Sequence, residues 1–150
     1  MFVQSIENKA VLNSQYQTIV CVTDQRECDR IIVAGKILAD RLGTDLVVLN
    51  VTNPNLAQTP DSIEYLFSVA KQKSAQMVIL YATDVSKSII RYIKENKVMN
   101  VLTGVPQEGD SVISRVWGKF THIRFFVIEQ DGSIRKVAHS VRAARKLIEA

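Results

Sequence analysis

The stretch Thr103-Gly104-Val105-Pro106-Gln107-Glu108-Gly109-Asp110-Ser111-Val112 joins an apolar run to the start of a helical pattern. The run before it, residues 99–103, is typical of a buried strand, Gly104 permits a tight turn, and Ser111 is a typical helix N-cap. In a parallel α/β protein such a junction often binds phosphate, because the amides at the helix N-terminus carry partial positive charge. The stretch therefore predicts an α/β fold and a phosphate-binding position to be tested.

Apolar runs rich in β-branched residues alternate with helical patterns along most of the chain. The predicted strands are 18–22, 46–51, 77–80, 98–102 and 123–128. The first three runs are almost wholly apolar, as in strands covered on both faces. The predicted helices are 29–42 (ended by Gly43), 63 to about 75, one capped by Asp84 and one capped by Ser111. This order predicts a doubly wound α/β domain with five parallel strands and right-handed crossovers.

The two ends of the chain fall outside this alternation. Residues 1–16 show no clear period and are interpreted as an N-terminal arm, whereas the α/β domain spans 17–129. Residues 130–150 are predicted to form a turn at Asp131-Gly132 and then a helix. The apolar stripe of that helix would consist of Ile134, Val137, Ala138, Val141, Ala144 and Ile148.

The formal charge of +4 arises from the basic residues of this last segment. We interpret them as the solvated flank of a docked C-terminal helix. Attraction to nucleic acid or to an anionic surface is the alternative. No aromatic residues interleave the basic ones, which disfavours single-stranded nucleic acid as a partner.

Several function classes lack their sequence signals. No run approaches the roughly 18 apolar residues of a membrane span. The first residues show no signal-peptide pattern, and Cys21 and Cys28 have no disulfide spacing, so we expect a cytoplasmic protein. Neither His122 nor His139 has metal-ligand spacing, and neither a P-loop nor a nucleophile elbow is present. We therefore expect no catalytic residues, no metal site and no enzyme activity.

With this order of elements, the chain resembles the universal stress protein superfamily over about residues 17–129. Residues 18–24, Thr-Ile-Val-Cys-Val-Thr-Asp, look like the first strand of that family, which commonly ends in an aspartate, and Gly104 looks like the first glycine of its phosphate loop. Residues 110–116 and 123–128 resemble its closing helix and last strand. Within the superfamily, residues 39–43 and 104–106 are most similar to the domain embedded in potassium-sensing (Kdp-type) histidine kinases. The resemblance implies a Rossmann-like sheet in the order 3-2-1-4-5.

The resemblance also implies a ligand site at the switch point of that sheet. Adenine and ribose would lie against Thr23, Asp24 and Val51, and phosphates would lie on the loop from Gly104 to Ser111. This chain departs from the ATP-binding pattern, because Ser111 follows Gly104 by half the usual spacing and Asp110 replaces a glycine. A carboxylate about 4 Å from a phosphate charge costs roughly 1–4 kcal/mol. We therefore expect no bound cofactor, with ATP or AMP as the alternative.

Cyclic di-AMP, which some kinase-embedded relatives bind, is a further ligand that the resemblance brings up. The required spacing is present between residues 23–25 and 46–50, but the required hydroxyl and aromatic residues are absent. The sequence therefore argues against a cyclic di-AMP site.

The sequence and its resemblance to the universal stress protein superfamily leave two functions open. The favoured one is a stress or signalling interaction module with a degenerate nucleotide crevice, whose partner is a protein such as a histidine kinase. The alternative is an adenine-nucleotide sensor that uses the switch-point crevice. The strand at Ile123 to Ile128 is predicted to form the sheet edge and, by resemblance, a homodimer interface.

Overall fold

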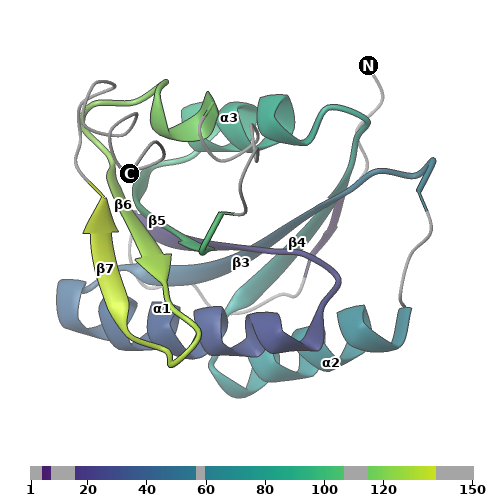
Figure 1. Ribbon diagram of the computed structural model, residues 1–150, viewed down its shortest axis with the longest axis horizontal. Helices are drawn as coiled ribbons and strands as arrows, with labels where there is room; N and C mark the ends of the chain where they lie inside the picture. Colours follow the sequence, from purple (N-terminus) through teal and green to yellow (C-terminus); the bar gives the residue numbers. More distant parts are fainter. Residues whose placement is uncertain (1–4, 8–15, 57–59, 107–114, 138–150) are drawn as a thin grey trace.

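The computed structural model describes residues 5–7, 16–56, 60–106 and 115–137. These residues form a seven-stranded sheet in the order β1-β4-β3-β2-β5-β6-β7, with helices on both faces (Figure 1). The strands are β1 (Ser5–Glu7), β2 (Gln17–Val22), β3 (Asp45–Thr52), β4 (Gln76–Tyr81), β5 (Val98–Gly104), β6 (Arg124–Ile128) and β7 (Ile134–Val137).

The five strands from β4 to β6 are parallel and confirm the predicted order 3-2-1-4-5. The central strand β2 pairs with β3 from Gln17 opposite Asp45 to Val22 opposite Asn50. On its other side it pairs with β5. From β2 the chain passes to β3 and β4 on one side of the central strand, and it then crosses to β5 and β6 on the other side. The topological switch point therefore lies between β2 and β5.

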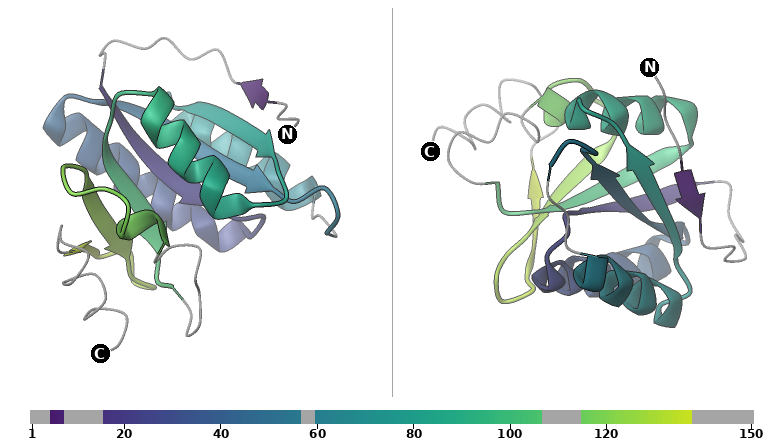
Figure 2. Two further views of the ribbon diagram at one scale, coloured as in Figure 1. Left: turned by 90° about the horizontal axis from the view of Figure 1, so that it is seen from above. Right: turned by 90° about the vertical axis from the view of Figure 1, so that its right-hand side faces the viewer.

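In the described ranges, three long helices cover the sheet, one layer on each face. Figures 1 and 2 show α1 (Asp29–Leu42) and α2 (Pro60–Gln72) on one face and α3 (Val85–Glu95) on the other. A short 3₁₀ turn, η1 (Arg26–Cys28), leads from β2 into α1. Residues 115–117, which are also helical, contribute to the α3 side of the core.

The predicted helix ends agree with the structure in two of three cases. α1 has the predicted bounds, and Gly43 ends it in the left-handed conformation with φ of 67°. Asp84 caps α3 as predicted, because its carboxylate accepts a hydrogen bond from the Lys87 amide at 3.1 Å. α2 begins at Pro60 and ends at Gln72, before the predicted end near residue 75, and the following turn places Ser74 at φ of 55°.

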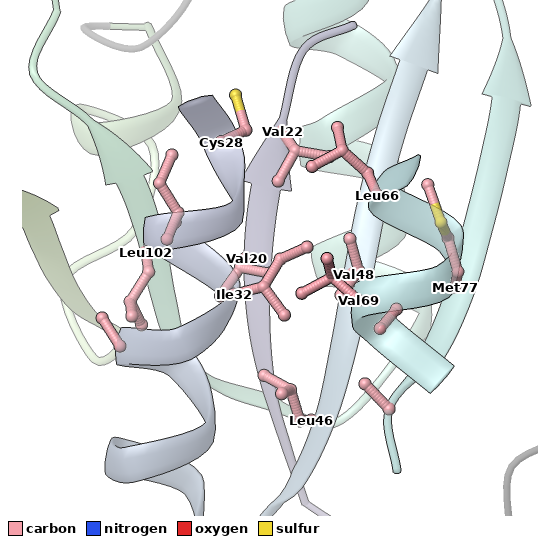
Figure 3. Packing of buried hydrophobic residues seen from close by; sticks show 14 of the residues in the cluster. Val20, Val22, Cys28, Ile32, Leu46, Val48, Leu66, Val69, Met77 and Leu102 are labelled. Carbon is pink, nitrogen blue, oxygen red and sulfur yellow. The ribbon is translucent and has the colours of Figure 1, made fainter. Parts of the chain in front are cut away.

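The alternating side chains of the parallel strands build two hydrophobic clusters. Val20 and Val48 face α1 and α2, where they pack with Ile32, Leu66 and other labelled residues of Figure 3. The opposite face holds a second cluster under α3 that includes Ile19, Val47, Trp117, Phe120 and Phe125. Both faces are apolar, which explains the continuous apolar runs in the sequence.

Gly35 lets α1 lie close to the sheet. A Cβ atom at this position would lie 2.4 Å from Val20 Cγ1 and 2.9 Å from Leu46 Cδ1. Both distances are far below van der Waals contact, so only glycine fits there without a shift of the helix. This close packing holds the N-terminal turn of α1 at the carboxyl end of the sheet.

The prediction that 130–150 form a turn and a helix is wrong from Ile134 to Val137. The turn lies at Asp131-Gly132 as predicted, with Gly132 at φ of 87°, but it closes a β-hairpin. Strand β7 pairs antiparallel with β6, with Ile128 opposite Ile134 and Phe125 opposite Val137. Pairing satisfies the backbone groups along β6, which outweighs the helical pattern of the sequence. Residues 138–150 lie outside the described residues.

The prediction that β6 forms the sheet edge is therefore also wrong. β7 occupies the backbone groups through which β6 was expected to pair with a second copy of the chain. At the other edge, the predicted N-terminal arm contributes strand β1, which pairs antiparallel with β4 from Ser5 opposite Leu80 to Glu7 opposite Val78. The sheet thus ends in an antiparallel strand on each side.

Candidate functional site

The carboxyl ends of β2 and β5 form the switch-point crevice, the position where a ligand is expected in this topology. Thr23 and Asp24 directly follow β2, and Gly104 is the last residue of β5. The structure brings these three predicted residues to the same end of the sheet. Ser111 lies outside the described residues.

The predicted residues next to β2 differ in their surroundings. The exposed Thr23 has its hydroxyl 3.4 Å from the Cys28 thiol, and Asp24 is half-buried. Val51 lies one strand away, in β3, and its half-buried side chain packs against the cluster on the α3 face. Val51 therefore belongs to the opposite face from Asn50 and does not line the α1 side of the crevice.

Asn50 closes the ends of β2 and β3. Its buried amide donates a hydrogen bond to the Val22 carbonyl at 3.0 Å, and its own oxygen accepts one from the Thr52 hydroxyl. The last carbonyl of β2 is thereby used within the protein. Sequence reasoning missed this role, although a lone polar residue within the apolar run 46–51 was a signal for it.

Arg30 is the charged residue of the crevice that sequence reasoning missed. It is half-buried in the first turn of α1 and extends over the ends of β5 and β6. Its Nε donates to the Glu129 carbonyl at 3.1 Å, and its Nη1 donates to the Glu27 carbonyl at 2.8 Å. A Cβ atom on Gly104 would lie 3.4 Å from its Nη2. The guanidinium thus stands beside Gly104, where the resemblance places phosphates.

The position of Arg30 has a simple origin in the sequence. The helix that follows the central strand begins at the switch point in a doubly wound sheet. A long basic side chain in its first turn therefore reaches the crevice.

A second group of charged residues joins η1 and α1 to α2. The guanidinium of Arg26 lies 3.9 Å from the ring centre of Tyr65, and the Tyr65 hydroxyl donates to the Asp29 carboxylate at 2.6 Å. The hydrogen bond to Asp29 raises the pKa of Tyr65 above its ordinary value. These contacts use three polar groups to hold two helices together.

Arg115 approaches the start of α3 at the carboxyl end of β4. Its Nη1 donates to the Ser86 hydroxyl at 3.1 Å, and Ser86 in turn donates to Asp84 at 3.1 Å. Hydrogen bonds from the Lys87 amide and Ser86, together with nearby charge including Arg115, hold the pKa of Asp84 below its ordinary value. Several cations and carboxylates therefore lie at the carboxyl end of the sheet, and those described above already make hydrogen bonds or ring contacts within the protein.

Two side chains of types that often take part in catalysis, His122 and Cys21, differ in their surroundings. His122 lies before β6, at the amino end of the sheet, in edge-to-face contact with Phe120. Burial raises the pKa of the Cys21 thiol to about 12, which keeps it protonated and unreactive. Within the ranges that the structure describes, no three His, Cys, Asp or Glu side chains are grouped as metal ligands.

The structure shows a groove away from the predicted crevice. It has a volume of about 590 Å³ and lies at the amino ends of β5 and β6, with Lys94, Lys97 and His122 among its lining residues. None of the predicted site residues lines it. The topology predicts a ligand site at the carboxyl end of the sheet, whereas this groove lies at the amino end.

In the part of the chain that the structure describes, no helix is long and apolar enough to cross a bilayer. Comparison of the sequence with models of protein families gave no match, and comparison with curated protein sequences gave none either.

Proposed function

We propose that the protein is an interaction module of the universal stress protein type, in which the switch-point crevice no longer holds a nucleotide. The observation that carries this proposal is the position of Arg30 beside Gly104. Its guanidinium fills space that the resemblance assigns to phosphates, and two of its nitrogens are bonded to backbone carbonyls. The short loop and Asp110 in the sequence support the same conclusion.

Displacing Arg30 has an energetic cost. A hydrogen bond that involves a charged group contributes about 1.5–3 kcal/mol when it is buried, and less at a half-buried site such as this one. A ligand would have to offset the loss of two such bonds. The Asn50 amide adds to this barrier, because it already occupies the Val22 carbonyl at the ribose side.

The partner of such a module is a protein, and α1 offers a surface for it. Val33 and Ile37 lie one turn apart on the outer face of α1 and are 42% and 46% exposed. Two neighbouring exposed apolar side chains favour contact with an apolar surface of a partner. By the sequence resemblance, a histidine kinase of a signalling system is the partner that we propose.

The first experiment is a calorimetric titration of the full chain with ATP, AMP and cyclic di-AMP. The module should give no binding heat with any of them at millimolar ligand. A second measurement tests binding to the cytoplasmic parts of histidine kinases from the same organism. Ile37→Glu should weaken that binding at least tenfold, whereas Leu56→Glu, which changes an exposed apolar residue in the loop after β3, should not.

A second candidate is a sensor for a short adenine nucleotide such as AMP. The same arginine favours it, because a cation beside Gly104 can face a single phosphate while Asp24 faces the ribose. In this case the wild type binds AMP in the low micromolar range. Arg30→Ala and Asp24→Ala then each weaken binding at least tenfold, and Arg41→Ala at the far end of α1 leaves it unchanged.

The Arg30→Ala variant separates the two candidates. For the sensor it removes the phosphate contact, so affinity falls from a measurable wild-type value. If the protein is the interaction module, the wild type gives no binding heat. The variant then gives either no binding heat or weak ATP binding in the space that the Arg30 side chain has left. Micromolar AMP binding to the wild type that is lost in Arg30→Ala would refute the interaction module.

A further inference from the structure

The groove at the amino ends of β5 and β6 is built from segments that are far apart in the sequence. The end of α3, the start of β5, the segment before β6 and Tyr16 before β2 all contribute to it. Its lining residues are Tyr16, Ile93, Lys94, Asn96, Lys97, Val98, Met99, Phe120, His122 and Ile123. Its volume of about 590 Å³ is in the range of sites for ring-containing small molecules.

The floor of this amino-end groove is apolar and rigid. Ile93, Val98, Phe120 and Ile123 are all at most 7% exposed. The Phe120 ring also meets the His122 ring edge to face, with centres 6.4 Å apart and planes at 82°. Above this floor, Tyr16 is 42% exposed and Met99 is half-buried, so these two lining residues offer contact area to an aromatic ring.

The rim of the groove is basic. Lys94, Lys97 and His122 line it, and none of the described lining residues is acidic. The carboxyl end of α3 adds a partial negative charge of about half a unit, which the full charge of Lys94 outweighs. The Asn96 amide also donates to the Tyr92 carbonyl at 2.9 Å and so satisfies one of the terminal carbonyls of α3.

From this combination we propose that the amino-end groove binds a small amphipathic monoanion, with an aromatic ring against Tyr16 and Met99 and one carboxylate or sulfonate group facing Lys94. The apolar lining selects the ring, and the basic rim selects a single negative charge. This site is separate from the switch-point crevice, and it stands whether or not the crevice binds a nucleotide.

The test uses anilinonaphthalene sulfonate, an aromatic monoanion, as the probe. We expect saturable binding of one equivalent to the native full chain in the tens of micromolar range. Amide chemical-shift changes should be confined to residues 16, 93–99 and 120–123. The neutral analogue N-phenylnaphthylamine, which has the same rings without the charge, should bind about tenfold more weakly, and added salt should reduce this difference.

Charge reversal at the rim gives the matched comparison. Lys94→Glu should weaken probe binding about tenfold, since it replaces an attraction with a repulsion. Lys71→Glu is the control, because Lys71 is also a lysine in the last turn of a helix but belongs to α2, on the other face of the sheet. Both variants change the net charge equally, so a general charge effect would appear in both.

Three results would overturn the proposal. They are non-saturable binding, shift changes that lie outside the groove, and equal affinity of Lys94→Glu and Lys71→Glu for the probe. The Arg30→Ala variant separates this test from that of the crevice. It changes the carboxyl end of the sheet and should leave probe binding unchanged, because Arg30 does not line the groove.

Discussion

The two ends of the parallel sheet differ in what fills them. At the carboxyl end, Arg30 and Asn50 reach into the switch-point crevice and bond to the carbonyls of Glu129 and Val22. At the amino end, the side chains of α3 and of the segment before β6 leave a groove of about 590 Å³. Within the described residues, protein side chains thus lie at the end that topology favours for a ligand, and a groove lies at the other end.

The comparison shows that the strand order determines where a crevice forms, whereas the side chains around it determine how much space remains. Strands that diverge at the switch point leave room for a ligand only where the residues around them are short. Here one arginine in the first turn of α1 is long enough to cross the ends of two strands. Among the described residues, the Arg30 side chain thus fills part of the crevice that the topology forms.

The largest expected effect comes from pushing α1 away from the sheet. Gly35→Val should destabilise the protein by about 3 kcal/mol, because the added atoms overlap the buried Val20 and Leu46 side chains. The shift would also move Arg30 and so loosen the carboxyl end. Urea unfolding monitored by circular dichroism measures the loss.

The control for this prediction is Lys36→Val, which places the same residue at the next position on a partly exposed face. It removes only the surface ion pair between Lys36 and Asp40, so it should cost less than about 1 kcal/mol. Equal stability of Gly35→Val and Lys36→Val would show that α1 is not tightly packed on β2.

The next effect compares one substitution at both ends of the sheet. At the amino end, the fully buried Thr18 hydroxyl lies 2.6 Å from the Thr44 hydroxyl and accepts a bond from Asn100 at 3.0 Å. Thr18→Val should cost about 2 kcal/mol, because it leaves these buried groups without their partner. Chemical denaturation of the purified variants measures the cost.

Thr52→Val at the carboxyl end is the matched variant. Thr52 is half-buried and its hydroxyl donates to Asn50, so water can replace the lost bond and the cost should stay below about 1 kcal/mol. A larger loss of stability for Thr52→Val than for Thr18→Val would show that burial of the hydroxyl does not set the cost at the two ends.

The smallest effect concerns pH and the cap of α3. The pKa of Asp84 in the folded protein lies below its ordinary value of 3.8, so its ionised form stabilises the fold. This contribution is present above the unfolded pKa and is lost as the pH falls through the lower folded pKa. Asp84→Asn keeps a capping side chain but removes this titration.

Unfolding free energies measured at pH 7 and near pH 3 check this prediction. Both proteins should be similarly stable at pH 7, and the wild type should lose more stability than Asp84→Asn on acidification. Asp131→Asn, in the hairpin turn, is a useful comparison because the pKa of Asp131 is also lowered, by Ser133. An equal acid response of the wild type and Asp84→Asn would exclude a role of this carboxylate.

The sequence by itself determined the central part of the fold. Apolar runs such as 18–22 and 46–51 predicted strands covered on both faces, and the bounds of α1 followed from Asp29 and Gly43. These features depend on local periodicity and on helix caps, which act within a few residues. The order β4-β3-β2-β5-β6 followed from the sequence resemblance.

Only the tertiary structure decided the sheet edges and the state of the candidate site. The stretch from Ile134 to Val137 has a helical pattern, yet it becomes a strand because β6 offers unpaired backbone groups to it. Arg30 is an ordinary helix residue in the sequence, and its place beside Gly104 depends on how α1 packs across the sheet. The amino-end groove likewise joins Tyr16, α3 and the segment before β6, which the fold alone brings together, so no local pattern could predict it.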